Sequence, residues 1–293
     1  MPKLVWLNGD VTPLESAVTT VADHAHLYGD GLFEGIRIYG GKVFKLDEHL
    51  DRLYHGIAYL GFEMHIGQAE LRRTVLDVCR QAGIQDGYIR LNVTRGSGLG
   101  LDPKAINRTP NVMIMVSTLS LYPPEAYELG LSVVTVPIKV IPPDALDARV
   151  KCIGRYASNI IAKQYANRTG AGEGLMLNQH GQIAECTGDN IFLIFGEVVR
   201  TPHPSCGILK GVTRDTVIGL AKDAGYVVEE TVLTPLDVFA ATEAFLTGTA
   251  AELIPMVTLD GSKVGCGTPG PVTQKLMALF RAETAKGTPF GTV

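Results

Sequence analysis

The sequence has little excess charge, few cysteines and no long apolar run, and each shortage excludes a class of protein. Its formal net charge is −4, so it lacks the basic surface typical of proteins that bind nucleic acid or an anionic membrane. No apolar stretch approaches the ~20 residues that a membrane-spanning helix needs. The start, Met1-Pro2-Lys3, leads directly into a predicted strand without the pattern of a signal peptide. We therefore expect a cytoplasmic protein with no nucleic-acid partner and no membrane partner.

The cysteines and histidines give no metal-binding pattern either. The sequence has 5 cysteines, and none of them stands in a CxxC spacing. This argues against a disulfide framework and against a zinc site. Asp23, His24 and His26 look like the start of a metal cluster, but no later ligand completes a coordination geometry. We expect packing or hydrogen-bonding roles for these three side chains and no bound metal.

Glycine-rich stretches are present, but the familiar phosphate-binding fingerprints are not. Residues 96–103 are too irregular for a dinucleotide-binding motif and lack the Lys-Ser/Thr ending of a P-loop. Two leucines in this loop, Leu99 and Leu101, form an apolar tip, which more often contacts a partner than water. The glycines of residues 28–39 alternate with large side chains, and they either allow close backbone approach or mark bulges.

Length and composition favour two domains. A chain of 293 residues with 46% hydrophobic content can bury a large core, and it is longer than a typical single domain. Prolines interrupt the pattern at residues 122–125, where we place the boundary. We predict a small N-terminal α/β domain over residues 1–121, a linker over 122–130, and a larger C-terminal domain over 131–293 that carries Lys151.

Lys151 and Glu185 stand in an order that imine chemistry could use. Lys151 ends a strand-like segment that begins at Asp147, and a helical pattern opens at Tyr156. Glu185 follows an apolar strand in a predicted hairpin over residues 174–185. A lysine becomes nucleophilic when its ammonium form is disfavoured, and a buried carboxylate needs a cationic or protonated partner. The pair therefore suggests an imine to a pyridine aldehyde whose ring nitrogen is kept protonated by Glu185.

A simpler interpretation of the same residues stays open. In it Lys151 is an exposed lysine, and Glu185 pairs with a neighbouring arginine. Lys139 and Lys163 are rival lysines. Lys163 lies among polar positions of the predicted helix, so we expect it to face water.

Three places in the sequence could bind an anion. Arg52 lies beside the apolar stripe of a predicted helix, where it either pairs with Glu48 or faces an anion. The helix start at Val212 and Thr213 offers unpaired amides and the positive end of the helix dipole. Alternatively, Thr213 only caps its helix. Residues 248–251 are small and polar and follow a buried strand, which makes a backbone-lined anion pocket plausible.

Four separated stretches together resemble one family. They are residues 28–37 (YGDGLFEGIR), 185–192 (ECTGDNIF), 211–214 (GVTR) and 247–252 (TGTAAE). In this order they resemble the class IV pyridoxal-phosphate aminotransferases, and among these most closely the branched-chain amino acid aminotransferases. The resemblance covers nearly all of the chain, from Trp6 to Thr273. It implies an α/β (α+β) fold of the D-amino-acid-aminotransferase type, with a small N-terminal α/β domain and a larger C-terminal pseudo-barrel domain.

The resemblance implies pyridoxal 5′-phosphate as the cofactor and assigns residues to it. Lys151 would form the imine with the cofactor and then carry the proton between the cofactor and the substrate α-carbon. Glu185 would pair with the pyridine nitrogen, and Tyr156 would bond the ring hydroxyl. Four residues would hold the phosphate: Arg52, Val212 through its amide, Thr213 and Thr249.

The resemblance also implies how substrates are held. The amides of Thr249 and Ala250 and the hydroxyl of Tyr88 would bind the α-carboxylate, and Arg90 would take the second carboxylate of 2-oxoglutarate or glutamate. Other residues would wall the side-chain pocket or be supplied by a partner subunit: Phe33, Tyr156, Leu99, Leu101 and Tyr28. Because family members are dimers whose partner supplies the glycine-rich loop, we expect a homodimer or higher homo-oligomer with shared active sites.

The implied reaction is transamination of L-leucine, L-isoleucine or L-valine with 2-oxoglutarate, giving branched-chain 2-oxo acids and L-glutamate, as in branched-chain amino acid biosynthesis. A D-amino acid aminotransferase or an aminodeoxychorismate lyase on the same fold is the alternative. From a different class, a non-catalytic cofactor-binding protein could use Leu99 and Leu101 as its partner surface. Arg155 and Leu91 stand where family members commonly carry other residues, so the preferred amino donor stays open.

Overall fold

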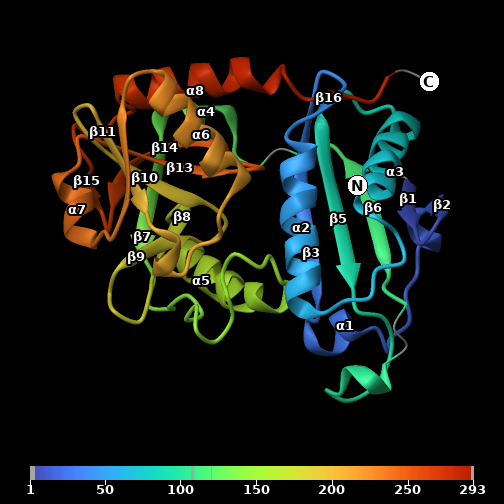
Figure 1. Ribbon diagram of the computed structural model, residues 1–293. Helices are drawn as coiled ribbons and strands as arrows, with labels where there is room; N and C mark the ends of the chain where they lie inside the picture. The colour runs from blue at the N-terminus through green and yellow to red at the C-terminus, as the bar shows by residue number, and fades with distance from the viewer. Residues whose placement is uncertain (1–3, 107–108, 120, 292–293) are drawn as a thin grey trace. The chain divides into compact units, whose positions relative to one another are not determined.

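The structure is a computed structural model that describes residues 4–106, 109–119 and 121–291, and contacts within the chain divide it into two compact units. Unit 1 takes the described part of Met1–Leu119 together with Val150–Arg155 and Thr284–Val293. Unit 2 takes the described part of Ser120–Arg149 together with Tyr156–Glu283. Figure 1 shows the elements of each unit. The units are discontinuous in sequence, and Lys151 belongs to unit 1.

Backbone hydrogen bonds explain why residues 150–155 group with unit 1. The amide of Phe33 donates to the carbonyl of Lys151 over 3.2 Å, and the amide of Gly154 donates to the carbonyl of Gly29 over 3.0 Å. Cys152 forms an isolated antiparallel bridge with Leu32. The segment therefore runs alongside the start of a strand of unit 1, a long-range contact that a boundary drawn from composition does not reveal.

Unit 1 is built on an antiparallel seven-stranded sheet in the order β16-β4-β3-β5-β6-β1-β2. Its strands are β1 (Leu4–Leu7), β2 (Asp10–Pro13), β3 (Gly31–Tyr39), β4 (Lys42–Val43), β5 (Gly87–Thr94), β6 (Val112–Ser117) and β16 (Thr288–Pro289). Asn8 and Gly9 turn the chain between β1 and β2, both with positive φ, as the Asn-Gly pair predicts.

Helices α2 (Leu46–Leu60) and α3 (Gln68–Ala82) cover one face of this sheet, because α2 packs on β3, α3 packs on β6, and the two helices contact each other. Along β5 every second residue is buried, so one face points to the helices and the other does not. Helix α1 (His24–Tyr28) precedes β3. Gly61 and Gly83 end α2 and α3 in the left-handed conformation that glycine adopts without strain.

Unit 2 is built on a mixed nine-stranded sheet in the order β12-β11-β10-β13-β14-β7-β8-β9, with β15 added to β14. Its strands are β7 (Leu131–Thr135), β8 (Glu173–Leu177), β9 (Ile183–Cys186), β10 (Asn190–Phe195), β11 (Val198–Pro202), β12 (Val227–Thr231), β13 (Glu243–Gly248), β14 (Glu252–Leu259) and β15 (Ser262–Lys263). Strand β9 also contacts β10 and β11, so the sheet curls back on itself as a pseudo-barrel does.

The helices of unit 2 are α4 (Pro124–Leu129), α5 (Tyr156–Arg168), α6 (Val212–Asp223), α7 (Pro235–Ala240) and α8 (Pro271–Thr284). Short 3₁₀ turns lie at Leu14–Ser16, Pro103–Ala105, Ile153–Arg155 and Pro204–Cys206. None of the helices in the described part of the chain has the length and apolar content that a membrane crossing requires.

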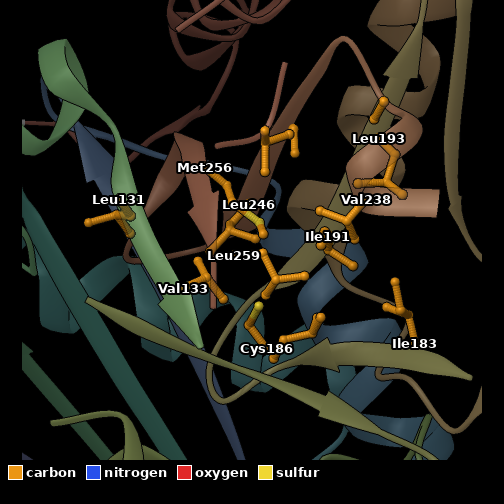
Figure 2. Packing of buried hydrophobic residues seen from close by; sticks show 14 of the residues in the cluster. Leu131, Val133, Ile183, Cys186, Ile191, Leu193, Val238, Leu246, Met256 and Leu259 are labelled. Carbon is orange, nitrogen blue, oxygen red and sulfur yellow. The ribbon is translucent and has the colours of Figure 1, made fainter. Parts of the chain in front are cut away.

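The apolar core of unit 2 fills the inside of the curled sheet. Figure 2 shows side chains from β7, β9, β10, β13 and β14 meeting there, among them Leu131, Ile191, Leu246 and Met256. Leu246 is fully buried and is paired with Ile191 on β10 and Ile254 on β14. Strand β10 is buried on both faces from Asn190 to Ile194, as its continuous apolar run predicts.

Truncation of Leu246 should lower the free energy of unfolding by about 2–5 kcal/mol, because the lost apolar contacts leave a cavity in a packed core. Urea unfolding of Leu246→Ala would measure the loss. Leu236→Ala is the matched control, because Leu236 is 76% exposed and its truncation should change stability little. Equal effects of the two substitutions would contradict this description of the core.

Candidate active site

The residues that the sequence singles out divide between the units. Unit 1 holds Lys151, Arg52, Tyr28, Phe33, Tyr88, Arg90, Leu99 and Leu101. Unit 2 holds Tyr156, Glu185, Val212, Thr213, Thr249 and Ala250. Within each unit they gather on a few elements.

Lys151 lies in an irregular segment, not in the strand-like segment predicted for residues 147–151, so that prediction is wrong. Asp147 explains the difference, because its carboxylate accepts a hydrogen bond from the amide of Arg149 and turns the chain. The Lys151 ammonium nitrogen lies 4.5 Å from the centre of the Phe33 ring, and its side chain is half-buried. Lys151 is thus placed against an aromatic ring and not in open solvent.

The rival lysines are placed differently. Lys139 is exposed. Lys163 does not simply face water as predicted: its Nζ donates to the carbonyl of Gly172 over 2.5 Å and lies 3.5 Å from the Glu173 carboxylate. Lys163 is therefore tied into a polar cluster of unit 2.

The face of the unit 1 sheet opposite α2 and α3 combines an aromatic ring with cations. Three cross-strand pairs of β3 and β5 lie on this face: Phe33 with Asn92, Gly35 with Arg90, and Arg37 with Tyr88. The Arg90 guanidinium lies 3.6 Å from the centre of the Phe33 ring. A Cβ at Gly35 would lie 1.9 Å from the Tyr88 hydroxyl, so a larger residue there would displace the Tyr88 ring. Arg37 belongs to the first of the four motifs, and no role was predicted for it, although its spacing from Phe33 in an alternating strand indicates the shared face.

On the helix-covered face of the same sheet, Arg52 contacts a carboxylate that our sequence analysis did not single out. Its Nε and Nη2 donate to the two carboxylate oxygens of Glu34 over 2.8 and 2.7 Å. His49 Nδ1 lies 2.7 Å from Glu34 Oε2. Lys45 is the ion-pair partner of Glu48, at 3.1 Å. Arg52 thus pairs with Glu34, and Glu48 pairs with Lys45, although spacing along the helix suggests a pair between Arg52 and Glu48.

The charge of this cluster is set by burial and by neighbours. Burial alone would raise the pKa of Glu34, but the charge and hydrogen bonds of Arg52, helped by His49, outweigh it and lower the pKa to about 2. Burial lowers the pKa of His49, although Glu34 opposes the shift. Glu34 is thus a carboxylate at neutral pH.

Leu99 and Leu101 lie on an exposed loop of unit 1, with 74% and 79% of their surfaces accessible. The loop is tied to α1, because the Gly100 amide donates to the Tyr28 hydroxyl over 3.1 Å. His24 lies 2.9 Å from the Gly100 carbonyl and 2.7 Å from Asp30, so it has the hydrogen-bonding role that the sequence predicts. The apolar tip is therefore presented outward on an anchored loop.

In unit 2, Glu185 projects from β9 and is 6% exposed. Its Oε2 accepts a hydrogen bond from the Leu209 amide over 2.8 Å and one from Asn190 Nδ2 over 3.2 Å. Asn190 Nδ2 also donates to the Leu209 carbonyl over 2.9 Å. Two donors thus hold one carboxylate oxygen in place. Asn190 belongs to one of the four motifs, although no role was predicted for it from the sequence.

A pocket opens beside this carboxylate. It is lined by Tyr156, Asn159, Glu185, Cys186, Thr187, Gly188, Asp189, Asn190 and Leu209. Asn159 Nδ2 donates to the Thr187 carbonyl over 2.8 Å, which ties α5 to the rim of the pocket. Tyr156 and Glu185, both singled out from the sequence, line the same pocket.

Helix α6 begins beside the same residues. Its N-cap is Gly211, no side chain caps it, and Thr213 lies inside the first turn, so Thr213 is not the cap. Glycine is needed at position 211, because a Cβ there would lie 2.2 Å from Asn190 Oδ1. The first turn of α6 therefore starts against Asn190 and presents backbone amides without a side-chain acceptor, an arrangement suited to a phosphate.

The turn that contains Thr249 and Ala250 follows β13 and is equally tightly placed. A Cβ at Gly248 would lie 2.0 Å from Asp189 Oδ1, so the turn rests on the Asp189 carboxylate. Burial, followed by the charge of Glu173, raises the pKa of Asp189 to about 7. The turn is thus supported by a buried acid whose neutral form is favoured by its surroundings.

Comparisons with known proteins agree with this arrangement. The family model described as amino-transferase class IV matches residues 31–259. The chain belongs to the class IV aminotransferases. Enzymes of this family are transaminases that use pyridoxal 5′-phosphate, and the residues present fit that cofactor. Unit 2 offers a pocket lined by a fixed carboxylate and a tyrosine, next to a helix start without a side-chain cap.

Three relatives show how far the similarity extends. A putative branched-chain-amino-acid aminotransferase of Methanocaldococcus jannaschii is 41% identical over 278 residues, which cover 94% of this chain and 95% of that protein. The crystal structure of the Escherichia coli branched-chain amino acid aminotransferase matches with a TM-score of 0.93 and 33% identity, covering 96% of this chain and 94% of that one.

The third is the branched-chain amino acid aminotransferase from Thermobaculum terrenum, solved in its PLP-bound holo form. It matches with a TM-score of 0.88 and 28% identity, covering 99% of this chain and 99% of that one. The predicted family, mixed α/β fold and cofactor are therefore confirmed.

Asn190→Ala should reduce kcat/KM by about 10- to 100-fold, because a carboxylate oxygen of Glu185 loses a hydrogen-bond donor. Steady-state transamination kinetics would measure the loss. Asn167→Ala, at an exposed position of α5, is the control and should leave kcat/KM unchanged. An Asn190→Ala enzyme with wild-type kinetics would show that the Asn190 donor is not needed to fix Glu185.

The depressed pKa of Glu34 predicts a pH dependence of stability. Its folded-state pKa of about 2 lies below the ordinary value of 4.5, so its ionised form stabilises the fold above pH 4.5, and this contribution is lost as pH falls through about 2. The free energy of unfolding should therefore decline less steeply across this acid range in Glu34→Gln than in the wild type. Denaturant titrations of both proteins at several pH values would measure it, and parallel declines would refute the assignment.

Proposed function

We propose that the protein transfers the amino group of L-leucine, L-isoleucine or L-valine to 2-oxoglutarate, giving the branched-chain 2-oxo acids and L-glutamate. The observation that carries this proposal is the Phe33 ring with the Arg90 guanidinium 3.6 Å from its centre. An apolar surface suits an aliphatic side chain, and an adjacent arginine suits the second carboxylate of the dicarboxylic substrate. The names of the relatives point to the same substrates.

The proposed reaction uses the cofactor for the electronic step and the chain for positioning and proton transfer. Bound pyridoxal 5′-phosphate supplies an electron sink for the substrate α-carbon. Lys151 Nζ moves a proton to and from that carbon as a general base and acid. Glu185 holds the proton on the pyridine nitrogen, and the Leu209 and Asn190 donors keep its carboxylate in one orientation.

The remaining roles in the proposal concern binding. Tyr156 bonds the ring hydroxyl of the cofactor. The phosphate is held by Arg52, the Val212 amide, Thr213 and Thr249. The lack of a side-chain cap on α6 supports the roles of Val212 and Thr213, because an anion can take the acceptor position there.

Substrate carboxylates are assigned to two sets of donors. In unit 2, the amides of Thr249 and Ala250 bind the α-carboxylate. In unit 1, the Tyr88 hydroxyl assists them, and Arg90 takes the second carboxylate. Phe33, Tyr156, Leu99 and Leu101 wall the side-chain pocket.

We also propose that the protein acts as a cytoplasmic homodimer or larger homo-oligomer. The outward position of Leu99 and Leu101 supports this, since exposed leucines on an anchored loop suit a contact with a second copy. In this assembly the partner subunit supplies the leucines of the loop and Tyr28 to each site.

The first experiment follows the visible absorbance band of the bound cofactor after addition of L-leucine or, separately, D-alanine. We expect L-leucine alone to bleach the band. Bleaching by D-alanine alone would keep the cofactor and the family but overturn the proposed substrates. A protein with no cofactor band would overturn the proposed activity altogether.

Substitution of Lys151 tests the proton-transfer role. Lys151→Ala should slow the half-reaction with L-leucine by at least about 10²-fold, because general acid–base catalysis contributes factors of this size. Rapid-mixing absorbance measurements would give the rate. Lys139→Ala is the matched control, since Lys139 is exposed and should not affect the rate. Full activity in Lys151→Ala would contradict the assignment.

A further inference from the structure

Glu34 is a charged side chain in the apolar layer between the unit 1 sheet and its helices. It is 0% exposed, it lies between Leu32 and Ile36 on the helix-facing side of β3, and its cross-strand neighbour is Leu91. A carboxylate in such surroundings is costly unless it is fully hydrogen-bonded. An apolar residue at position 34 would satisfy packing alone, so we expect the Glu34 carboxylate to have a specific role.

Both carboxylate oxygens of Glu34 are directed at α2. One edge of the Arg52 guanidinium, Nε and Nη2, pairs with Oε1 and Oε2 over 2.8 and 2.7 Å, and His49 Nδ1 lies 2.7 Å from Oε2 on the other side. Glu34 and His49 are 0% and 2% exposed, whereas Arg52 is 13% exposed at its side chain. Glu34 and His49 thus form the buried end of the cluster, and the guanidinium lies at its more accessible end.

This geometry fixes the plane of the guanidinium. A side-on pair uses two of the five N–H groups of an arginine and leaves three outside the pair, in directions set by the carboxylate. Because the pair is electrically neutral overall, its attraction for an anion depends on where those N–H groups point more than on net charge. A lysine at the same place could supply the charge but not this fork of donors.

We propose that Glu34 and His49 are positioning residues for the cofactor phosphate: they lock the Arg52 guanidinium in one orientation, and that orientation, not the positive charge alone, makes Arg52 a phosphate ligand. The inference rests on the proposed function, which assigns Arg52 to the phosphate. It adds Glu34 and His49 to that assignment, as the buried residues that make Arg52 selective for a phosphate.

The test isolates the contribution of the phosphate to binding. Full-length protein stripped of cofactor is titrated with pyridoxal 5′-phosphate and with pyridoxal, and the ratio of the two dissociation constants is compared between variants. Loss of stability alone leaves this ratio unchanged in the folded molecules, whereas misplacement of Arg52 lowers it. We expect the ratio to fall by about 10-fold or more in Glu34→Gln, in the range that charge-assisted hydrogen bonds contribute.

Arg52→Lys separates orientation from charge. It should lower the ratio about as much as Glu34→Gln does, and the double variant should lower it little further, because both changes remove the same oriented donors. Glu48→Gln is the matched control, because it is also a change of glutamate to glutamine. Glu48 lies on α2, one turn before Arg52, but its carboxylate is paired with Lys45. Its ratio should equal that of the wild type.

Each outcome decides the inference. A folded Glu34→Gln protein with the wild-type ratio would overturn it, as would additive effects of Glu34→Gln and Arg52→Lys. If Glu34→Gln does not fold, His49→Ala is measured, and an unchanged ratio there overturns the role of His49 and with it the proposed cluster. A wild-type protein that binds pyridoxal as tightly as pyridoxal 5′-phosphate would instead defeat the assignment of Arg52 in the proposed function, which distinguishes the two failures.

Discussion

The position of Lys151 depends on a short backbone contact between residues 150–155 and the start of β3. The Gly154 amide bonds the Gly29 carbonyl, and the Phe33 amide bonds the Lys151 carbonyl. The contact is possible only with glycine at position 29, where φ is +69° and an added Cβ would lie 2.6 Å from Gly154 Cα. A lysine far away in sequence is thereby fixed against the aromatic ring of Phe33.

Unit 2 also has glycines at close contacts, here against two polar side chains at the start of β10. Asp189 and Asn190 stand side by side there, and each rests against a glycine of another segment: Gly248 before the Thr249 turn and Gly211 before α6. Asn190 also donates to Glu185. One end of a single buried strand therefore sets the relative positions of a carboxylate, a helix start and a turn within unit 2, and a substitution at any of these contacts disturbs all three.

Much of this arrangement can be predicted from the sequence, for reasons that are local. The Asn-Gly turn after β1, the buried run of β10 and the hairpin of β8 with β9 follow from turn chemistry and periodicity. The four motifs identify the family because each holds several side chains at fixed spacing. These signals are contained in short windows, so a single sequence reveals them.

Most features that escaped prediction depend on long-range contacts, although the irregular segment at residues 147–151 has a local cause in the turn at Asp147. Neither composition nor periodicity shows that Lys151 joins unit 1, since that depends on pairing with β3. The contact of Arg52 with Glu34 was not expected, because spacing along a helix points to Glu48, whereas the structure supplies Glu34 from a strand. Lys163 was expected to face water because its neighbours in the helix are polar, yet Gly172 and Glu173 lie beside it. Contacts of this kind appear only when separate elements are brought together.

Strand β16 gives unit 1 a particular dependence on the order of synthesis. It pairs with β4 at the edge of the seven-stranded sheet, and the carbonyl of Phe290 beside it accepts a hydrogen bond from Arg80 of α3. A ribosome makes these residues only after every residue of unit 2. During translation the β4 edge therefore stays open to pairing with other chains until β16 emerges, so the unit that is begun first is completed second.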